Sequence, residues 1–276
     1  MSKMKTYRTA LSIAGSDCSG GAGIQADIKT MSAFGVYAMT AITAITVQNT
    51  LGVTDVQGIR PDIVAGQIDA VYRDIRPDAV KIGMLFSPDI VASVADALER
   101  NKADNIVLDP VMIATSGDPL IDDEAIELIK NRLIPMSRII TPNANEARAL
   151  SGTDDIVLQI EALRTLGVHD ILLKGGDKSS DSGTSTDYLS LEGCDKILCL
   201  SHERINTPNT HGTGCTLSSA IASCLALGMS MHDSVTTAKD YISAALRNGA
   251  DVTIGHGHGP VNHLFAPHRL EPTNPI

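Results

Sequence analysis

Short apolar runs and amphipathic segments alternate along the whole chain, and this alternation predicts the fold class. Residues 10–14, Ala79–Ile82 and Ile106–Leu108 have the length and composition of buried strands. Residues 24–34 and 89–100 repeat apolar side chains at helical spacing. Such alternation is typical of an α/β protein with one central, mostly parallel sheet and helices on both faces.

The same alternation continues to the end of the chain, with two interruptions. The pattern predicts further strands at 38–47, 138–141 and 170–174, and helices at 63–75, 121–133, 156–166, 215–227 and 234–248. Residues 51–59 and 186–200 hold short strand-like runs, which we interpret as edge strands or lid pieces. In the second, the turn Glu192-Gly193 predicts a hairpin, and the polar stretch 175–184 before it predicts a surface loop.

The organisation of the chain indicates one domain over residues 1–276. No Pro/Ser-rich linker and no internal repeat divides it, and 276 residues suit one large α/β domain. The hydrophobic fraction of 43% is sufficient for a sizeable core.

Charge and composition argue against several partners. The formal charge of −10 repels nucleic-acid backbones, and only 3% of residues are aromatic, without any Trp. No apolar run has the length of a membrane helix, and residues 1–8 lack the apolar core of a signal peptide. The five cysteines form no CxxC pair, which indicates reduced thiols. We therefore expect a cytoplasmic protein without nucleic-acid or membrane partners.

The most informative local motif is Thr210-His211-Gly212-Thr213-Gly214-Cys215-Thr216, directly before an apolar helical segment. Glycines allow backbone N–H groups to converge, and a helix N-terminus adds partial positive charge. This combination suits a phosphoryl group whose charge develops in a transition state. The alternative is an ordinary loop with a Thr helix cap.

The motif resembles the anion-hole signature of the ribokinase-like superfamily. In that superfamily the residue after the second Gly of the motif is usually Asp, whereas this chain has Cys215. In this respect the chain resembles the branch that contains the hydroxymethylpyrimidine kinases and their pyridoxine-kinase relatives. The resemblance implies that Gly212, Thr213, Gly214 and Cys215 are catalytic. A helix N-terminus can lower a thiol pKa, so we expect Cys215 to be available as a thiolate base; the alternative is a small buried hydrophobic residue.

The first Gly-rich turn extends the resemblance. Ala14-Gly15-Ser16-Asp17 and the following run from Ser19 to Asp27 match the opening motif of this family, and the GxGxxG spacing of dinucleotide sites is absent. The match implies that Gly15 and Gly21 contact substrate. Asp27 is expected to help bind the substrate, or else to stabilise the first turn of the helix.

Three later segments resemble walls of the substrate pocket in the same family. They are Val47-Gln48-Asn49-Thr50, Lys81-Ile82-Gly83-Met84 and Leu108-Asp109-Pro110-Val111-Met112. The resemblance implies that Gln48 reads the pyrimidine and that Met84 and Val111 line its pocket.

Oxygen-bearing side chains after predicted strands suggest a Mg²⁺ and ATP site. Asp109 follows one strand, and Asn143 and Glu146 form the NxxE pattern of the superfamily. Taken singly, capping and turn roles are the simpler interpretation of each. Lys174 ends another apolar run, and we expect its ammonium group to reach the transferring phosphate as a point charge. We expect both Lys174 and Thr213 to contact the nucleotide.

The histidines give weaker signals. His256 and His258 suggest a metal site, but no Cys or carboxylate cluster accompanies them, so we expect a structural or nucleotide-pocket role. We interpret His202, His211 and His232 as ordinary polar or capping residues.

The resemblance covers the whole chain and implies an ATP- and Mg²⁺-dependent kinase. Its substrate would be 4-amino-5-hydroxymethyl-2-methylpyrimidine, phosphorylated to the monophosphate and then to the diphosphate in thiamine biosynthesis, by a homodimer. A pyridoxine kinase on the same fold and a non-catalytic metabolite-binding protein remain the alternatives. The segment Gln48-Asn49-Thr50 favours the pyrimidine.

Overall fold

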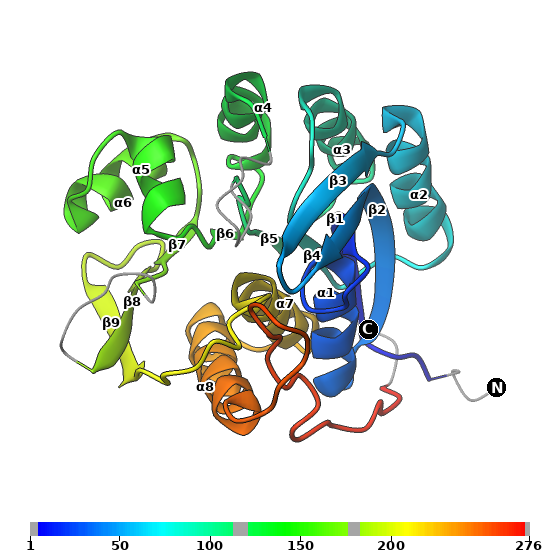
Figure 1. Cartoon of the computed structure of the whole chain (residues 1–276). Helices are drawn as coiled ribbons and strands as arrows, with labels where there is room; N and C mark the ends of the chain where they lie inside the picture. Colours follow the sequence, from blue (N-terminus) through cyan, green and yellow to red (C-terminus); the bar gives the residue numbers. More distant parts are fainter. Residues whose placement is uncertain (1–4, 113–120, 176–182, 274–276) are drawn as a thin grey trace.

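The computed structural model describes residues 5–112, 121–175 and 183–273, and one large sheet runs through them (Figure 1). Within these residues the sheet has nine strands in the order β3-β2-β1-β4-β5-β6-β7-β8-β9. Neighbouring strands from β2 to β7 are parallel. At the edges, β3, β8 and β9 pair antiparallel. The predicted α/β class with a mostly parallel sheet is confirmed.

Strands and helices alternate in the described residues as the apolar pattern predicts. The strands are β1 (Thr9–Asp17), β2 (Tyr37–Asn49), β3 (Gly52–Gly58), β4 (Ala79–Ile82), β5 (Ile106–Leu108), β6 (Ile139–Ile140), β7 (Asp170–Leu173), β8 (Thr184–Ser190) and β9 (Ile197–Glu203). The helices are α1 (Gly23–Ala33), α2 (Pro61–Asp74), α3 (Pro88–Arg100), α4 (Asp123–Leu128), α5 (Ala144–Ser151), α6 (Ile156–Thr165), α7 (Thr213–Ala226) and α8 (Met231–Gly249). A π-helical segment, Ile129–Leu133, continues α4.

The sheet separates two hydrophobic cores. Leu11 and Ile13 of β1 belong to the core beneath α2, α3, α4, α5 and α6. Ala10, which precedes Leu11 in sequence, belongs to the opposite core, beneath α1, α7 and α8. Figure 1 shows α1, α7 and α8 together below the sheet in the same view. Burial on both faces explains why the parallel strands are mostly apolar.

Four segments differ from, or refine, the predicted pattern. Strand β1 continues past Ala14 to Asp17 because it keeps pairing with β2 after a register shift between Ala14 and Ser16. Helix α5 was not predicted, since its eight residues include only one large apolar side chain, Leu150. The predicted hairpin is confirmed as β8 and β9. Most of the predicted loop 175–184 lies outside the described residues.

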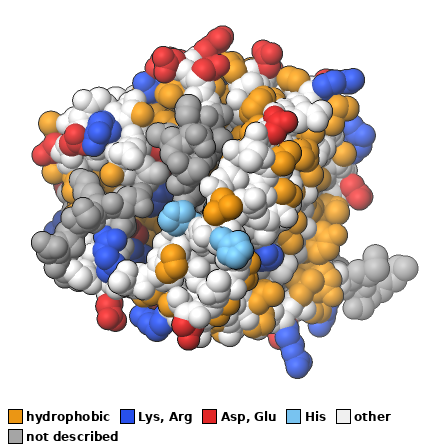
Figure 2. Space-filling view, viewed as in Figure 1, with side chains coloured by type: hydrophobic (Ala, Val, Ile, Leu, Met, Phe, Trp, Pro, Cys, Tyr) orange, Lys and Arg blue, Asp and Glu red, His pale blue; other side chains and the backbone are white. Residues whose placement is uncertain are grey.

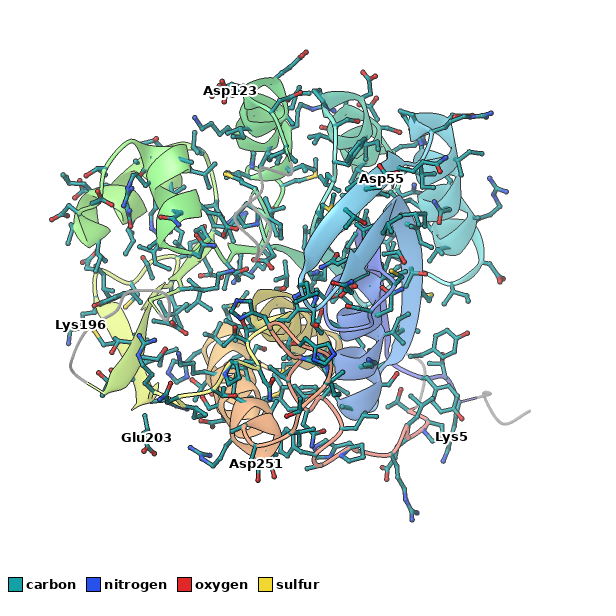
Figure 3. All side chains as sticks on the ribbon, viewed as in Figure 1. Lys5, Asp55, Asp123, Lys196, Glu203 and Asp251 are labelled. Carbon is teal, nitrogen blue, oxygen red and sulfur yellow. The ribbon has the colours of Figure 1, made fainter. Side chains whose placement is uncertain are left out.

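The carboxyl ends of the parallel strands meet at one edge of the sheet, where open α/β sheets bind ligands. The Gly-rich turn follows β1, Asp109 follows β5, Asn143 follows β6 and Lys174 follows β7. The labelled side chains of Asp123, Lys196 and Asp251 lie at the periphery of the molecule in Figure 3.

Candidate active site

Helix α7 begins at this edge without a side-chain cap. Its N-cap is Gly212, with φ of 79°, and this residue makes no side-chain capping hydrogen bond. A positive φ favours glycine, because other residues meet steric strain there. The alternative of an ordinary Thr cap is therefore wrong, and backbone donors at the positive end of the helix dipole stay available for an anion.

Two glycine loops pack against each other to form this end of the site. A Cβ atom on Gly212 would lie 1.9 Å from the carbonyl oxygen of Gly21, and one on Gly21 would lie 2.3 Å from the ring of His211. Neither position has room for a side chain. The close approach joins the turn after β1 to the loop before α7.

Lys174 and Asp109 form an ion pair beside the start of α7. Lys174 Nζ lies 2.7 Å from Asp109 Oδ1 and 3.9 Å from Glu146 Oε2. A Cβ on Gly214 would lie 3.3 Å from the same ammonium group. Burial opposes ionisation of Asp109, but the charges of Lys174 and Lys81 outweigh it and lower the pKa of that carboxyl. The structure thus brings Gly214, Lys174, Asp109 and Glu146 together.

Asn143 and Glu146 form a capping box at the start of α5. The side chain of Asn143 accepts from the backbone of Asn145 and Glu146, and Glu146 Oε2 accepts from the Asn143 backbone at 2.7 Å. The capping role, the simpler of the two sequence interpretations, is therefore observed. It does not conflict with a cation role for Glu146, because the buried carboxylate also faces Lys174.

Gln48 lies near the end of β2 and is linked to the loop before α7. Its amide contacts Thr46 Oγ1 at 3.1 Å and His211 Nε2 at 3.3 Å. The same His211 nitrogen lies 2.8 Å from Asp17 Oδ2, and it donates there because a carboxylate only accepts. His211 therefore connects the loop before α7 to Asp17 and contacts Gln48.

Asp17, which we did not predict as a site residue, organises the first Gly-rich turn. Its oxygens accept from the backbone of Ser19, Gly21 and Ala22. Burial opposes its ionisation, but these bonds and the one from His211 lower the pKa of Asp17 to about 2. A carboxylate directly before a Gly-rich turn was the signal that could have found it.

Asp27 is placed differently from the expected substrate contact. It lies in the second turn of α1, is fully buried, and pairs with Lys81 at 2.9 Å. Ser12 and Ser219 donate to its two oxygens at 2.6 Å each. Its side chain is thus occupied inside the protein, and neither a substrate contact nor a role in the first helical turn describes it.

Cys215 lies in the first turn of α7, and its thiol does not have the lowered pKa expected from sequence. Burial raises the pKa of Cys215 to about 11, although the charge of Lys81 acts in the opposite direction. The helix dipole does not offset this loss of hydration. Cys215 is therefore a neutral thiol at neutral pH, and the expectation of a readily formed thiolate was wrong.

The remaining predicted residues lie around this centre. Gly15 lies beside Met84, whose sulfur would lie 3.1 Å from a Cβ on Gly15. Val111 and Thr213 are partly exposed, the first shortly after the β5 end and the second opening α7. Figure 2, which has the same view as Figure 1, shows histidine side chains near the middle of this face of the molecule.

The Gly/His tail has a structural role. The backbone of His258 donates to Thr50 at 2.9 Å, and that of His211 donates to Gly259 at 3.0 Å. The tail thereby bridges the end of β2 and the loop before α7. Among the described residues no group of three His, Cys, Asp or Glu side chains could hold a metal ion.

Comparison with known proteins gives the family. The model of the family described as phosphomethylpyrimidine kinase matches residues 17–262. The hydroxymethylpyrimidine/phosphomethylpyrimidine kinase of Salmonella typhimurium is 47% identical over 264 residues, which cover 93% of this chain and 97% of that protein. The thiamine biosynthesis bifunctional protein ThiED of Geobacter sulfurreducens is 44% identical over 263 residues, 94% of this chain and 52% of that protein.

Solved structures agree with the fold. The pyridoxal kinase of Staphylococcus aureus in complex with AMP-PCP and pyridoxal superposes with a TM-score of 0.85 at 31% identity, covering 97% of each chain. The phosphomethylpyrimidine kinase of Clostridium difficile gives a TM-score of 0.74 at 42% identity, covering 86% of this chain and 99% of that one. Since the family model spans most of the chain and the uncapped, lysine-flanked helix is present, this chain is a kinase that belongs to the phosphomethylpyrimidine kinase family.

Proposed function

We propose that this kinase transfers the γ-phosphate of ATP to the hydroxymethyl group of 4-amino-5-hydroxymethyl-2-methylpyrimidine, and then to the phosphate of that product. One observation carries the proposal: the uncapped start of α7, beside Lys174, is linked through His211 to the amide of Gln48. A phosphate-holding helix end and a base-reading amide thus belong to one site. The names of the relatives support the same substrate.

The residues of the chain have distinct tasks in this proposal. The backbone N–H groups of Gly214 and Cys215 and the ammonium of Lys174 hold the charge of the phosphoryl group during transfer. Gly15, Gly21, Met84 and Val111 line the pocket. Cys215 would accept the proton of the acceptor hydroxyl as a thiolate, after its thiol has lost its own proton to solvent; a large thiolate fraction is not required, because the transition state of phosphoryl transfer is loose.

Mg²⁺ is the proposed cofactor, and Asp109, Asn143 and Glu146 are the residues that would hold it. The donor set suits this ion, which typically binds one or two carboxylates together with substrate phosphates and waters. The carboxylates of Asp109 and Glu146 are buried and both face Lys174. A cation bound there would therefore interact with the same two carboxylates as the ammonium group. The ion would neutralise charge on the ATP phosphates.

A pyridoxal kinase activity is the second candidate. It is favoured by the similarity to the Staphylococcus aureus enzyme, which exceeds in TM-score the similarity to the Clostridium difficile kinase. Sequence identity gives the opposite order, with 42% for the Clostridium difficile kinase and 31% for the Staphylococcus aureus enzyme. The residues that line the pocket, and not the overall shape, determine which base binds. A non-catalytic metabolite-binding protein is disfavoured because the helix end, Lys174 and Asp109 are all in place.

The test is ATP turnover with three acceptors: the hydroxymethylpyrimidine, its monophosphate and pyridoxal. We expect turnover with both pyrimidines and a kcat/KM for pyridoxal at least about tenfold lower, the equivalent of one lost hydrogen bond. Preference for pyridoxal would replace the proposal by the second candidate. ATP binding without turnover on any acceptor would favour the metabolite-binding protein.

We also propose that the whole chain is one domain and that it forms a homodimer. Exposed hydrophobic side chains on β2 support the dimer: Tyr37, Ile45 and Val47 are 45%, 41% and 56% exposed. Hydrophobic atoms gather over this strand in Figure 2. The measurement is the molar mass in solution, with Val47→Lys expected to give monomers.

In the described part of the chain, no helix combines the length and apolar character needed to cross a membrane. The cytoplasmic location stays a prediction.

A further inference from the structure

A second aspartate–lysine pair lies beneath the candidate site and has no part in the proposed mechanism. Lys81 of β4 and Asp27 of α1 have side chains that are 0% exposed, with Nζ 2.9 Å and 3.0 Å from the two carboxylate oxygens. Taking two charges out of water costs several kcal/mol per ion, so a buried pair is weak evidence of stabilisation. The pair therefore calls for another explanation.

The surroundings accommodate Lys81 closely. A Cβ on Gly83 would lie 2.7 Å from Lys81 Nζ and 3.2 Å from the side chain of Ala14. Any side chain at residue 83 would therefore meet the ammonium group. Burial alone would lower the pKa of Lys81, but the charges of Asp27 and Asp109 outweigh it and raise that pKa, so the group stays protonated.

Two successive positions at the start of α7 are each connected to one aspartate–lysine pair. Ser219, one turn after Cys215, donates to Asp27 Oδ1 at 2.6 Å. Ser218, one turn after Gly214, donates to Asp109 Oδ2 at 3.3 Å. Residues one turn apart share a helix face. The Lys174–Asp109 pair thus supports Gly214 from the accessible side, and the Lys81–Asp27 pair supports Cys215 from the buried side.

The charges around Cys215 come from three elements. Lys81 projects from β4 and lowers the pKa of the thiol, whereas Asp27 from α1 and Asp109 after β5 raise it. The backbone N–H of Gly23, at the start of α1, is hydrogen-bonded to the sulfur and lowers that pKa as well. Lys81 is the cationic side chain among these groups.

We propose that Lys81, held by Asp27 beneath the first turn of α7, is a positioning residue that fixes the place and electrostatic environment of Cys215. The inference rests on the proposed function for its catalytic consequence, but the geometry of the pair does not depend on the substrate. It accounts for a buried ion pair that stability alone does not explain.

The test compares Lys81→Met with Asp27→Asn. The amide introduced by Asp27→Asn would keep an acceptor for Ser219 and could donate to Ser12, so this change mainly removes a charge. We measure the alkylation rate of Cys215 by mass spectrometry of its peptide from neutral to alkaline pH, without substrate. Lys81→Met should slow alkylation about tenfold, the effect of one pKa unit, and Asp27→Asn should accelerate it. A purely structural role would shift both variants in the same direction, which would overturn the proposal.

Lys239→Met is the matched control. Lys239 and Asp187 form another buried pair, at 2.7 Å with side chains 8% and 4% exposed, between α8 and β8. This variant should destabilise the protein without changing the alkylation rate of Cys215. If it changes that rate as much as Lys81→Met does, loss of any buried pair is sufficient and the proposal fails.

The double variant Lys81→Met/Asp27→Asn separates stability from positioning. Removing both charges avoids leaving one unpaired, so the double variant should be more stable than Lys81→Met. We nevertheless expect its kcat for the pyrimidine to stay at least about tenfold below wild type, with KM for ATP little changed. Recovery of kcat together with stability would overturn the proposal. Absence of pyrimidine turnover in the wild type would instead contradict the proposed function and leave the alkylation test valid.

Discussion

The amide of Gln48 uses only part of its hydrogen-bonding capacity inside the protein. The amide oxygen lies 3.1 Å from Thr46 Oγ1, whereas the amide nitrogen faces His211 Nε2, which donates to Asp17 and cannot also accept. One lone pair and both amide hydrogens of Gln48 are therefore without a partner in the described residues. An aminopyrimidine edge offers an amino donor beside a ring-nitrogen acceptor. The amino group can donate to the unpartnered lone pair of Gln48, and the ring nitrogen can accept from an unpartnered amide hydrogen. A pyridoxine edge offers a different arrangement. The structure thus supports Gln48 as the residue that discriminates between the two candidate substrates.

We predict that Gln48→Met lowers kcat/KM for the hydroxymethylpyrimidine about five- to a hundredfold, the equivalent of about 1–3 kcal/mol for stranded buried polar atoms. Met keeps a similar volume but removes both hydrogen bonds. Pyridoxine, if accepted, should be affected less. The measurement is kcat/KM for both substrates with both proteins. Equal losses would mean that Gln48 only shapes the pocket.

Cys215 is the second residue whose role can be measured directly. We predict that Cys215→Ala lowers kcat about a hundredfold, the usual contribution of a proton-transferring group, while an ATP analogue still binds. Because burial raises the thiol pKa to about 11, the wild-type kcat should rise with pH above neutrality, and the variant should lose this rise. Near wild-type turnover in Cys215→Ala would show that the residue only packs.

Helix α5 connects a local capping signal to the proposed metal site. Its first turn holds Glu146, whose carboxylate both closes the capping box and faces Lys174. Replacing Glu146 by Gln keeps an oxygen that can accept from the Asn143 backbone, so the cap remains and only the charge is removed. The element therefore offers a way to test the metal role apart from the helix.

We predict that Glu146→Gln raises the Mg²⁺ concentration needed for half-maximal rate by about tenfold, since Mg²⁺ binding depends on carboxylate charge. Asp155→Asn, which changes the exposed N-cap of the neighbouring helix α6, is the control and should leave the titration unchanged. A titration that Glu146→Gln does not move would remove Glu146 from the metal site. Asp109→Asn should behave like Glu146→Gln if both hold the ion.

At the scale of the whole molecule, the C-terminal tail packs a neutral histidine against α7. His263 is buried and its Nε2 lies 3.0 Å from Thr216 Oγ1. The Thr216 hydroxyl donates to Gly212, so it accepts from His263. Burial, together with the charges of Lys29 and His211, lowers the pKa of His263 to about 4. The unfolded chain, with the ordinary pKa near 6.5, binds this proton first.

The consequence is a loss of stability on acidification. Between about pH 6.5 and pH 4 the unfolded state binds more protons than the folded state, so the free energy of unfolding falls as pH falls. For this one group we expect a loss of about 2 kcal/mol between about pH 7 and pH 5. Urea unfolding at both pH values measures it. His263→Gln should show a correspondingly smaller loss, and an equal loss would assign the effect to other groups.

The sequence by itself determined the fold class and most elements. The runs Ala79–Ile82 and Ile106–Leu108 have the same bounds in the structure, because strands buried on both faces are mostly apolar; Lys81 is the exception in the first run, and its charge is paired with Asp27. The motif before α7 was also recognisable in the sequence, since the positive φ of Gly212 and its close backbone approach leave few alternatives to glycine.

Only the tertiary structure decided which charged side chains meet. Asp27 and Lys81 are 54 residues apart, and Asp109 and Lys174 are 65 apart, so no local pattern reveals either pair. Cys215 has a raised rather than a lowered thiol pKa because burial by distant segments outweighs the dipole of its own helix. His211 connects the loop before α7 to Asp17, which is 194 residues away in the chain. Local patterns predict the elements and the motifs, whereas burial and charge pairing depend on how remote segments pack.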